Sequence, residues 1–323
     1  MVERLWDDPQ IYRWSASAAQ TQNCYLLVDR QQVLAIDPML HEEQDWQALE
    51  RAIGELPGAP TLRQVLLTHL YSDWMAAASG AGLRQVKLLV SQTDRRLSGQ
   101  KEPWEYQRRW YRREGFPARH LKDYNGEDVR WSGRTEQIAT VEPGEIVTVG
   151  SLELHCLRLP GHTPGHTALG LPTKSLAFSG DTLLLDGLPY IGAWKGHPHA
   201  LEQYLAGLEL LRGAALQTIF PAHGAWGALP PRRIDDVMRH YYLRLIELYQ
   251  LVLDHPGLTA YELAARFRWR QQPWDTLSIK EQWFAMGETL AHLIYLRDRR
   301  YVETKSGEGS LINVPGAKKL TDM

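Results

Sequence analysis

Four short segments of the sequence each carry histidine or aspartate beside small or turn-forming residues. They are Thr68–Trp74 (THLYSDW), Gly161–His166 (GHTPGH), Ser179–Thr182 (SGDT) and Pro221–Gly224 (PAHG). Imidazole nitrogens and carboxylate oxygens are ligands for divalent metal ions. A single segment of this kind is more often a structural turn than a functional site. Four of them in one chain indicate an assembled metal site.

Each of these segments follows a short apolar run that predicts a β-strand. The runs lie at residues 65–68, 152–157, 175–178 and 218–220. Because functional side chains often lie on the loops that a rigid scaffold positions, we expect these strand ends to meet at one site.

The remaining elements suggest two parts. Strands expected at 24–28, 33–36, 86–90, 146–149 and 168–171 alternate with helices expected at 41–56, 73–80 and 199–211. Residues 94–135 interrupt this rhythm, and their stretch 104–113, rich in aromatic residues and arginine, is expected to be a packed helix or a lid. Helices at 234–254, 259–267 and 279–298 and a hairpin at 301–313 suggest a winged-helix-like module. The predicted domains are therefore 1–232, with the helical insertion, and 233–323.

Composition narrows the classes of function. The 323 residues include 44% hydrophobic and 23% charged residues, as in a globular protein, with a net charge of −2. Residues 233–323 hold 13 Lys and Arg against 12 Asp and Glu, so we expect no nucleic-acid partner. Two cysteines, no signal-peptide pattern and no long apolar run favour a cytoplasmic protein without a membrane span.

The order of the four segments resembles the metallo-β-lactamase-fold hydrolases, a superfamily that includes hydroxyacylglutathione hydrolase. The resemblance covers about residues 10–232 and extends to Gly287–Leu296 (GETLAHLIYL), which is similar to the C-terminal module of one hydrolase branch. It implies an α/β fold, an αβ/βα sandwich with metals at the rim of its two sheets, followed by the small helical domain.

The first metal motif of that family, H-x-H-x-D-H, is incomplete here. His69 and Asp73 occupy the first histidine and the aspartate positions, whereas Tyr71 and Trp74 replace the second and last histidines. By resemblance, one metal would take His69, residue 71, His162 and Asp181. The second would take Asp73, residue 74, Asp181 and His223. Five of the seven ligands therefore remain.

The two substitutions differ in their consequences. An indole has no lone pair for a metal and would crowd the second position, so we expect no second ion. His69, His162 and Asp181 are two histidines and one carboxylate, a set that holds zinc or iron with open positions. Asp73 would then act as a base or orienting carboxylate, and the Tyr71 hydroxyl would donate to an oxyanion.

The resulting prediction is hydrolysis of an ester, thioester or similar small acyl substrate through at most one metal. Tyr190 and Lys195, which follow the Asp181 strand, are candidates for substrate contacts. The alternative is a non-catalytic binding or scaffold protein, in which protonated histidines neutralise the carboxylates without any metal. A nuclease of the same superfamily is disfavoured by the near-neutral charge.

Three further expectations concern the surroundings of the site and the assembly. His166 should orient neighbouring loops rather than bind metal, and Asp37 should cap the floor of the site. Apolar faces of the C-terminal helices predict a homodimer, with Trp283 and Tyr295 near a neighbouring subunit.

Overall fold

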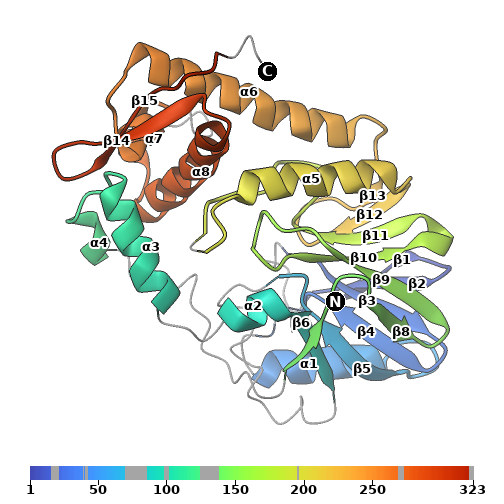
Figure 1. Cartoon of the computed structure of the whole chain (residues 1–323). Coiled ribbons are helices and arrows are strands. Elements are labelled where there is room, and N and C mark those ends of the chain that lie inside the picture. Colours follow the sequence, from blue (N-terminus) through green and yellow to red (C-terminus); the bar gives the residue numbers. More distant parts are fainter. Residues whose placement is uncertain are drawn as a thin grey trace. The chain divides into compact units, whose positions relative to one another are not determined.

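The computed structural model describes residues 1–15, 22–38, 40, 43–69, 86–97, 102–123, 138–194, 196–267 and 273–319. The chain forms two compact units (Figure 1). Unit 1 comprises Met1–Gln100, Glu127–Pro189 and Glu209–Arg233, and unit 2 comprises Lys101–Gly126, Tyr190–Leu208 and Ile234–Met323. These units are defined by which residues pack together, and each combines segments that are distant in sequence. The domain boundaries expected from the sequence, 1–232 and 233–323, remain a prediction.

Unit 1 contains two β-sheets (Figure 1). The strands of the first run in the spatial order β1(Val2–Trp6), β2(Gln10–Trp14), β3(Cys24–Asp29), β4(Gln32–Ile36), β5(Thr61–Leu66), β6(Lys87–Ser91) and β7(Ile138–Val141). Those of the second follow the order β13(Gly227–Ala228), β12(Thr218–Pro221), β11(Leu176–Gly180), β10(Thr167–Leu171), β9(Leu152–Arg158) and β8(Ile146–Val149). Strands β4 to β7 are parallel to one another, as are β11 and β12.

Alternating side chains of the first sheet enter two different hydrophobic cores. In β3, Tyr25 and Leu27 join a core shared with Phe178 and Phe220 of the second sheet. The intervening Leu26 lies in a core on the opposite face. Because successive side chains of a strand point to opposite faces, a strand buried on both sides is apolar throughout. The expected apolar runs therefore become central strands.

Two helices of unit 1 follow from local sequence. Helix α1(Glu43–Gly54) carries Trp46, Leu49 and Ile53 on one buried face, and these residues fill the outer core of the first sheet. Helix α2(Gln92–Leu97) begins after Ser91, whose hydroxyl accepts a hydrogen bond from the Asp94 amide, as N-cap residues do. The helix expected at 73–80 lies outside the described residues.

Unit 2 consists of helices and one hairpin. Its elements are α3(Glu102–Arg113), α4(His120–Asp123), the first part of α5(Ala200–Gly213), α6(Arg233–Asp254) from Ile234 onward, α7(Ala260–Arg266), α8(Ile279–Asp298), β14(Val302–Ser306) and β15(Leu311–Pro315). Thr259 with Glu262, and Ser278 with Glu281, form capping boxes that begin α7 and α8. The expected helices and terminal hairpin are confirmed.

The insertion helix α3 packs into unit 2. Tyr111 lies 4.1 Å from Trp283 of α8 between ring centroids, and Phe116 lies 5.3 Å from the same indole. Glu114, only 1% exposed, accepts hydrogen bonds from both terminal nitrogens of Arg297 at 3.1 and 3.0 Å. The insertion and the C-terminal helices therefore share one core.

The mixed α/β fold with a helical C-terminal module agrees with the expected fold class. None of the helices in the described ranges is both long and apolar enough to cross a lipid bilayer.

Removing the Glu114 carboxylate should destabilise unit 2. Glu114→Ala leaves the Arg297 guanidinium without its bidentate partner in a buried site, which typically costs about 3–5 kcal/mol. Glu105→Ala, which removes an exposed carboxylate from the preceding helix α3, should change stability by less than about 0.5 kcal/mol. Urea unfolding followed by tryptophan fluorescence measures both. Equal effects would show that the pair contributes nothing beyond a surface ion pair.

The protonation of a buried histidine provides a second test, of how the stability of unit 2 depends on pH. His292 of α8 has no exposed surface, and its Nδ1 donates to the Glu288 carbonyl at 2.8 Å. Tyr241 and Phe267 flank the ring at centroid distances of 6.0 and 6.1 Å. Burial lowers the pKa of His292 to about 3, and this outweighs the carbonyl contact, which raises it. The imidazole is therefore neutral in the folded chain.

Stability should consequently fall in acid. An unfolded histidine takes up a proton below about pH 6.5, so His292 should remove about 1.4 kcal/mol of stability per pH unit between 6.5 and 3. Its contribution is complete above pH 6.5. His292→Gln should reduce this slope, whereas His155→Gln at an exposed position should keep it. Unfolding curves at several pH values in EDTA measure the slope, and an unchanged slope in His292→Gln would contradict the assignment.

Candidate metal centre

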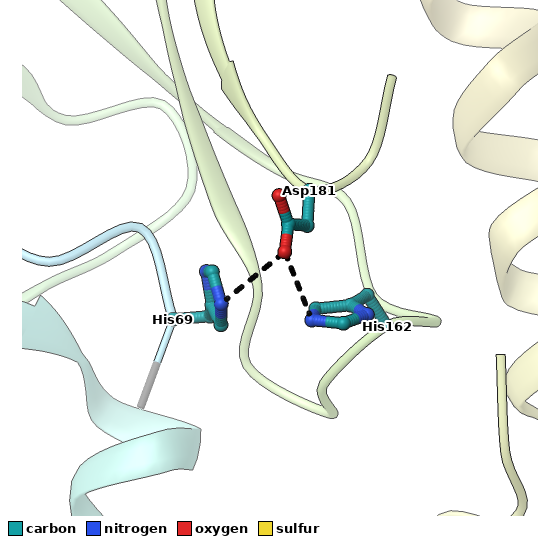
Figure 2. A group of neighbouring side chains, drawn as sticks. All are labelled: His69, His162 and Asp181. Carbon is teal, nitrogen blue, oxygen red and sulfur yellow. Dashed lines mark ion pairs between the residues drawn. The ribbon is translucent and has the colours of Figure 1, made fainter. Parts of the chain in front are cut away.

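The structure places four of the predicted residues at strand ends of unit 1. His69 follows β5, His162 lies between β9 and β10, Asp181 follows β11, and His223 follows β12. Figure 2 shows His69 and His162 directed toward the Asp181 carboxylate. The sandwich thus brings together residues that are more than 100 positions apart in the sequence.

Asp181 is the common partner of three histidines. Its Oδ2 lies 3.8 Å from Nε2 of His69 and 3.4 Å from Nε2 of His162. Its Oδ1 accepts a hydrogen bond from Nδ1 of His223 at 2.8 Å. One carboxylate oxygen therefore faces two imidazoles, and the other is held by the third. His69, His162 and Asp181 are all buried, with exposed fractions of 1, 5 and 5%.

A hydrogen-bonded chain fixes the His69 ring. The Thr68 hydroxyl donates to Oδ2 of Asp37 at 2.7 Å, and the Thr68 amide donates to Oδ1 of the same carboxylate at 2.7 Å. Burial raises the pKa of Asp37 to about 7. When Asp37 is ionised, the single hydrogen of the Thr68 hydroxyl goes to the carboxylate, and the hydroxyl oxygen accepts from Nδ1 of His69, 2.9 Å away. Nδ1 is then the protonated nitrogen, and Nε2, which faces Asp181, keeps its lone pair. Asp37 orients the site, as its position at the end of a strand suggested.

His166 holds the backbone of the Asp181 loop. Its Nε2 accepts a hydrogen bond from the Asp181 amide at 2.9 Å, and its Nδ1 lies 2.9 Å from the Thr182 hydroxyl. Both ring nitrogens are occupied, so the ring positions Asp181 and has no nitrogen left for a metal. This agrees with the orienting role expected for His166. Burial lowers the pKa of His166 to about 3, which keeps the ring neutral.

Gly180 makes this arrangement sterically feasible. Its φ of +52° lies in the left-handed region, and a β-carbon there would overlap the His166 imidazole and the Thr68 hydroxyl. The chain can turn from β11 into Asp181 only because this position has no side chain.

A buried aspartate that the sequence did not single out fixes the loop carrying His162. Asp94, 4% exposed, accepts from the Gly165 amide at 2.8 Å and from the Thr163 hydroxyl at 3.0 Å. The pattern Ser91-x-x-Asp94 is typical of the first turn of a helix, so the sequence could have placed Asp94 there. It does not indicate that the Asp94 carboxylate binds the loop of His162. The partner lies about 70 residues away, and only the fold reveals it.

The charges within the cluster determine its protonation. Burial alone would raise the pKa of Asp181, but the hydrogen bond from His223 and the nearby His162 and His69 hold it below its usual value. Burial lowers the pKa of His69, whereas Asp181 outweighs burial at His223 and raises the pKa there. Asp181 is therefore a carboxylate and His69 is neutral, whereas His223 holds a proton more readily than a free histidine does.

The other predicted site residues divide into two groups. Tyr71, Asp73, Trp74 and Lys195 lie outside the described residues. Tyr190 belongs to unit 2, where its hydroxyl interacts with that of Tyr111 above Gly287. A β-carbon at Gly287 would overlap both hydroxyls, so this glycine has a packing role.

The donor set fits a divalent metal ion. Ligand atoms of His69, His162 and Asp181 all lie within 4.8 Å of one another, in a buried position. Two imidazole nitrogens, one with its lone pair preset by Thr68, and one ionised carboxylate form a donor set that zinc and iron(II) accept.

Sequence comparison places the chain in a family. The profile of the metallo-beta-lactamase superfamily matches residues 19–223, more than half of the chain. The chain therefore belongs to the metallo-beta-lactamase superfamily, which the two sheets and the histidine–aspartate cluster at their strand ends already suggested.

Individual relatives match shorter stretches. A beta-lactamase-like protein 2 homolog of Caenorhabditis elegans is 24% identical over 139 residues, which cover 43% of this chain and 44% of that protein. Hydroxyacylglutathione hydrolase of Cereibacter sphaeroides is 40% identical over 68 residues, 21% of this chain and 26% of that enzyme. These matches span less than half of either relative.

Solved structures match nearly the whole chain. A Burkholderia ambifaria beta-lactamase domain protein has a TM-score of 0.79 and 21% identity, covering 98% of this chain and 94% of its own. A metallo-beta-lactamase family protein from Thermus thermophilus has a TM-score of 0.75 and 23% identity, covering 94% and 98%. The fold is therefore shared along the length of the chain, including the C-terminal helices.

Gly180→Ala should destabilise the protein more than a matched glycine substitution. Gly187 also has a positive φ, +75°, but no atom lies within 4 Å of its expected β-carbon. Gly187→Ala should therefore cost about 1–2 kcal/mol for backbone conformation alone. Gly180→Ala should add about 1–3 kcal/mol of overpacking against His166 and Thr68. Urea unfolding gives both values, and equal losses would refute the steric role of Gly180.

Proposed function

We propose that this chain is a cytoplasmic metal-dependent hydrolase of an ester, thioester or similar small acyl substrate. At most one zinc or iron ion would be held by His69, His162 and Asp181. The buried triad of two imidazole nitrogens and one carboxylate oxygen carries this proposal. The similarity to hydroxyacylglutathione hydrolases supports the class of substrate.

The residues around the triad would prepare it for binding. Asp37 and Thr68 keep the proton of His69 on Nδ1, so that Nε2 is available as a ligand. His223 holds Oδ1 of Asp181 and leaves Oδ2 facing the two histidines. When bound there, a divalent ion supplies Lewis acidity and a nucleophilic water near neutral pH.

The substrate-facing roles remain part of the proposal. Asp73 would act as a base or orienting carboxylate, and the Tyr71 hydroxyl would stabilise the developing oxyanion. His223, bonded to Asp181, would be a neighbour of the ion rather than a ligand of a second one. Tyr190 and Lys195 would contact the substrate, and the active protein would be a homodimer.

The second candidate is a non-catalytic binding or scaffold protein. The specific observation in its favour is that His223 already pairs with Asp181 at 2.8 Å and has a raised pKa. A protonated imidazole can neutralise a carboxylate as a metal ion would. Metal content separates these two candidates.

Protein purified without added metal should contain about one zinc or iron ion per chain, because three donors converge in a buried site. His162→Ala should reduce the content to near zero, since only two donors remain. His155→Ala, which removes an exposed histidine of β9, should retain it. Elemental analysis measures the metal, and hydrolysis of a panel of thioesters and lactones measures activity.

Wild-type protein that holds no metal even after incubation with zinc or iron(II) would favour the non-catalytic candidate. Metal retained equally by His162→Ala would reject the ligand assignment while leaving open the hydrolase class.

A further inference from the structure

The loop that carries His223 is held by one asparagine side chain. Asn23 directly precedes β3 and is 4% exposed. Its Nδ2 donates to the Pro221 carbonyl at 3.0 Å and to the Gly224 carbonyl at 2.9 Å. A carboxamide has two N–H hydrogens, so both are used here. The backbone carbonyls on the two sides of His223 are therefore tied to the same side chain.

Asn23 also joins the two sheets of unit 1 at this point. Its backbone amide donates to the Ala222 carbonyl at 2.7 Å. Strand β3 belongs to the first sheet, whereas β12, which ends at Pro221, belongs to the second. The candidate metal centre draws on both sheets, because His69 follows β5 of the first and Asp181 follows β11 of the second. Asn23 thus links the sheets beside the residues that form the centre.

The position of the His223 side chain depends on such support. Its imidazole is 33% exposed, whereas the Asp181 carboxylate that it contacts is 8% exposed. Surrounding side chains therefore enclose the imidazole less than they enclose its partner. Its Nδ1 nevertheless lies 2.8 Å from Oδ1 of Asp181, the distance of a well-formed hydrogen bond. Because such a bond weakens steeply as its angle bends, the backbone of His223 must be placed accurately.

The two donors explain why this residue is an asparagine. Both groups that its side chain contacts are carbonyl oxygens, which only accept hydrogen bonds. An ionised aspartate of the same size has no donor and would set its negative oxygens against these carbonyls. An alanine would remove both bonds and leave the loop without this attachment to the first sheet.

We propose that Asn23 is a positioning residue of the metal centre. By holding the Pro221–Gly224 loop, it keeps Nδ1 of His223 on Oδ1 of Asp181. Oδ2 of Asp181 is then left facing the other two histidines. The role of Asn23 toward an ion rests on the proposed function, whereas the placement of His223 is a property of the metal-free chain. Separate measurements can test these two parts.

Heteronuclear NMR spectra of the imidazole groups, recorded on the full chain in EDTA, test the placement of His223. Its Nδ1 proton should exchange slowly with water and give a resolved signal, because Asp181 accepts it. Asn23→Ala should abolish this signal or accelerate its exchange at least about tenfold. Tyr25→Phe removes a hydroxyl that donates to the Pro221 carbonyl at 2.7 Å, on one side of the loop only. It is the matched control and should keep the signal, and His223→Ala identifies the signal.

Circular dichroism verifies that these variants are folded. If Asn23→Ala does not fold, Asn23→Ser keeps one donor and should weaken the signal to a smaller extent. A wild-type chain without a protected His223 proton would overturn the proposal, as would a signal that the Asn23 variants leave unchanged. Equal loss in Tyr25→Phe would overturn the specific role of Asn23.

Zinc affinity tests the role of Asn23 toward an ion, and competition with a chromophoric chelator measures it. His223→Ala should weaken zinc binding roughly tenfold and Asn23→Ala several-fold, since partners that orient a metal ligand typically contribute this much. Because Asn23 acts through His223, adding Asn23→Ala to His223→Ala should change the affinity by less than about twofold.

Additive losses in the double variant would overturn the role toward the ion, because an effect transmitted elsewhere in the structure adds to that of His223→Ala. A wild-type chain that binds no zinc would overturn the proposed function itself. The metal-free spectra would still decide whether Asn23 places His223 on Asp181.

Discussion

The Asp181 carboxylate, buried among three histidines, is the interaction on which the site depends. A buried carboxylate is costly unless partners stabilise its charge, and here His223 holds one oxygen while His69 and His162 face the other. The same charge that makes the group expensive to bury makes it a strong ligand. Either a metal ion or a protonated histidine must balance it, and these two states separate the enzyme from the non-catalytic alternative.

The rest of unit 1 positions this carboxylate and the rings around it. His166 holds the Asp181 backbone, Thr68 and Asp37 set the His69 tautomer, and Asp94 fixes the loop of His162. Each of these partners is buried, so its hydrogen bonds do not compete with water. The site is therefore organised by buried polar groups that are hydrogen-bonded to one another. The three candidate ligands are only some of these groups, and the others fix their positions.

Much of the fold and four site residues could be predicted from sequence, because local signals specify them. Apolar runs followed by histidine or aspartate place His69, His162, Asp181 and His223 at strand ends. Strands β1 and β2 were not predicted, since charged and aromatic residues interrupt their alternation. The role of Asp94 could not be predicted either, because its partners come from a loop distant in sequence. Packing of α3 on Trp283 likewise depends on tertiary contacts that no local pattern encodes.

The central claim is that the Asp181 cluster holds a metal ion through two imidazoles and one carboxylate. X-ray absorption spectroscopy at the zinc edge, on protein loaded with one equivalent of zinc, tests it most directly. The account predicts multiple-scattering features of about two imidazole ligands together with oxygen donors near 2.0–2.2 Å. His69→Ala should lose the bound zinc and with it the imidazole signal, because, as in His162→Ala, only two donors remain. A spectrum without imidazole scattering, or one unchanged by that substitution, would contradict the account.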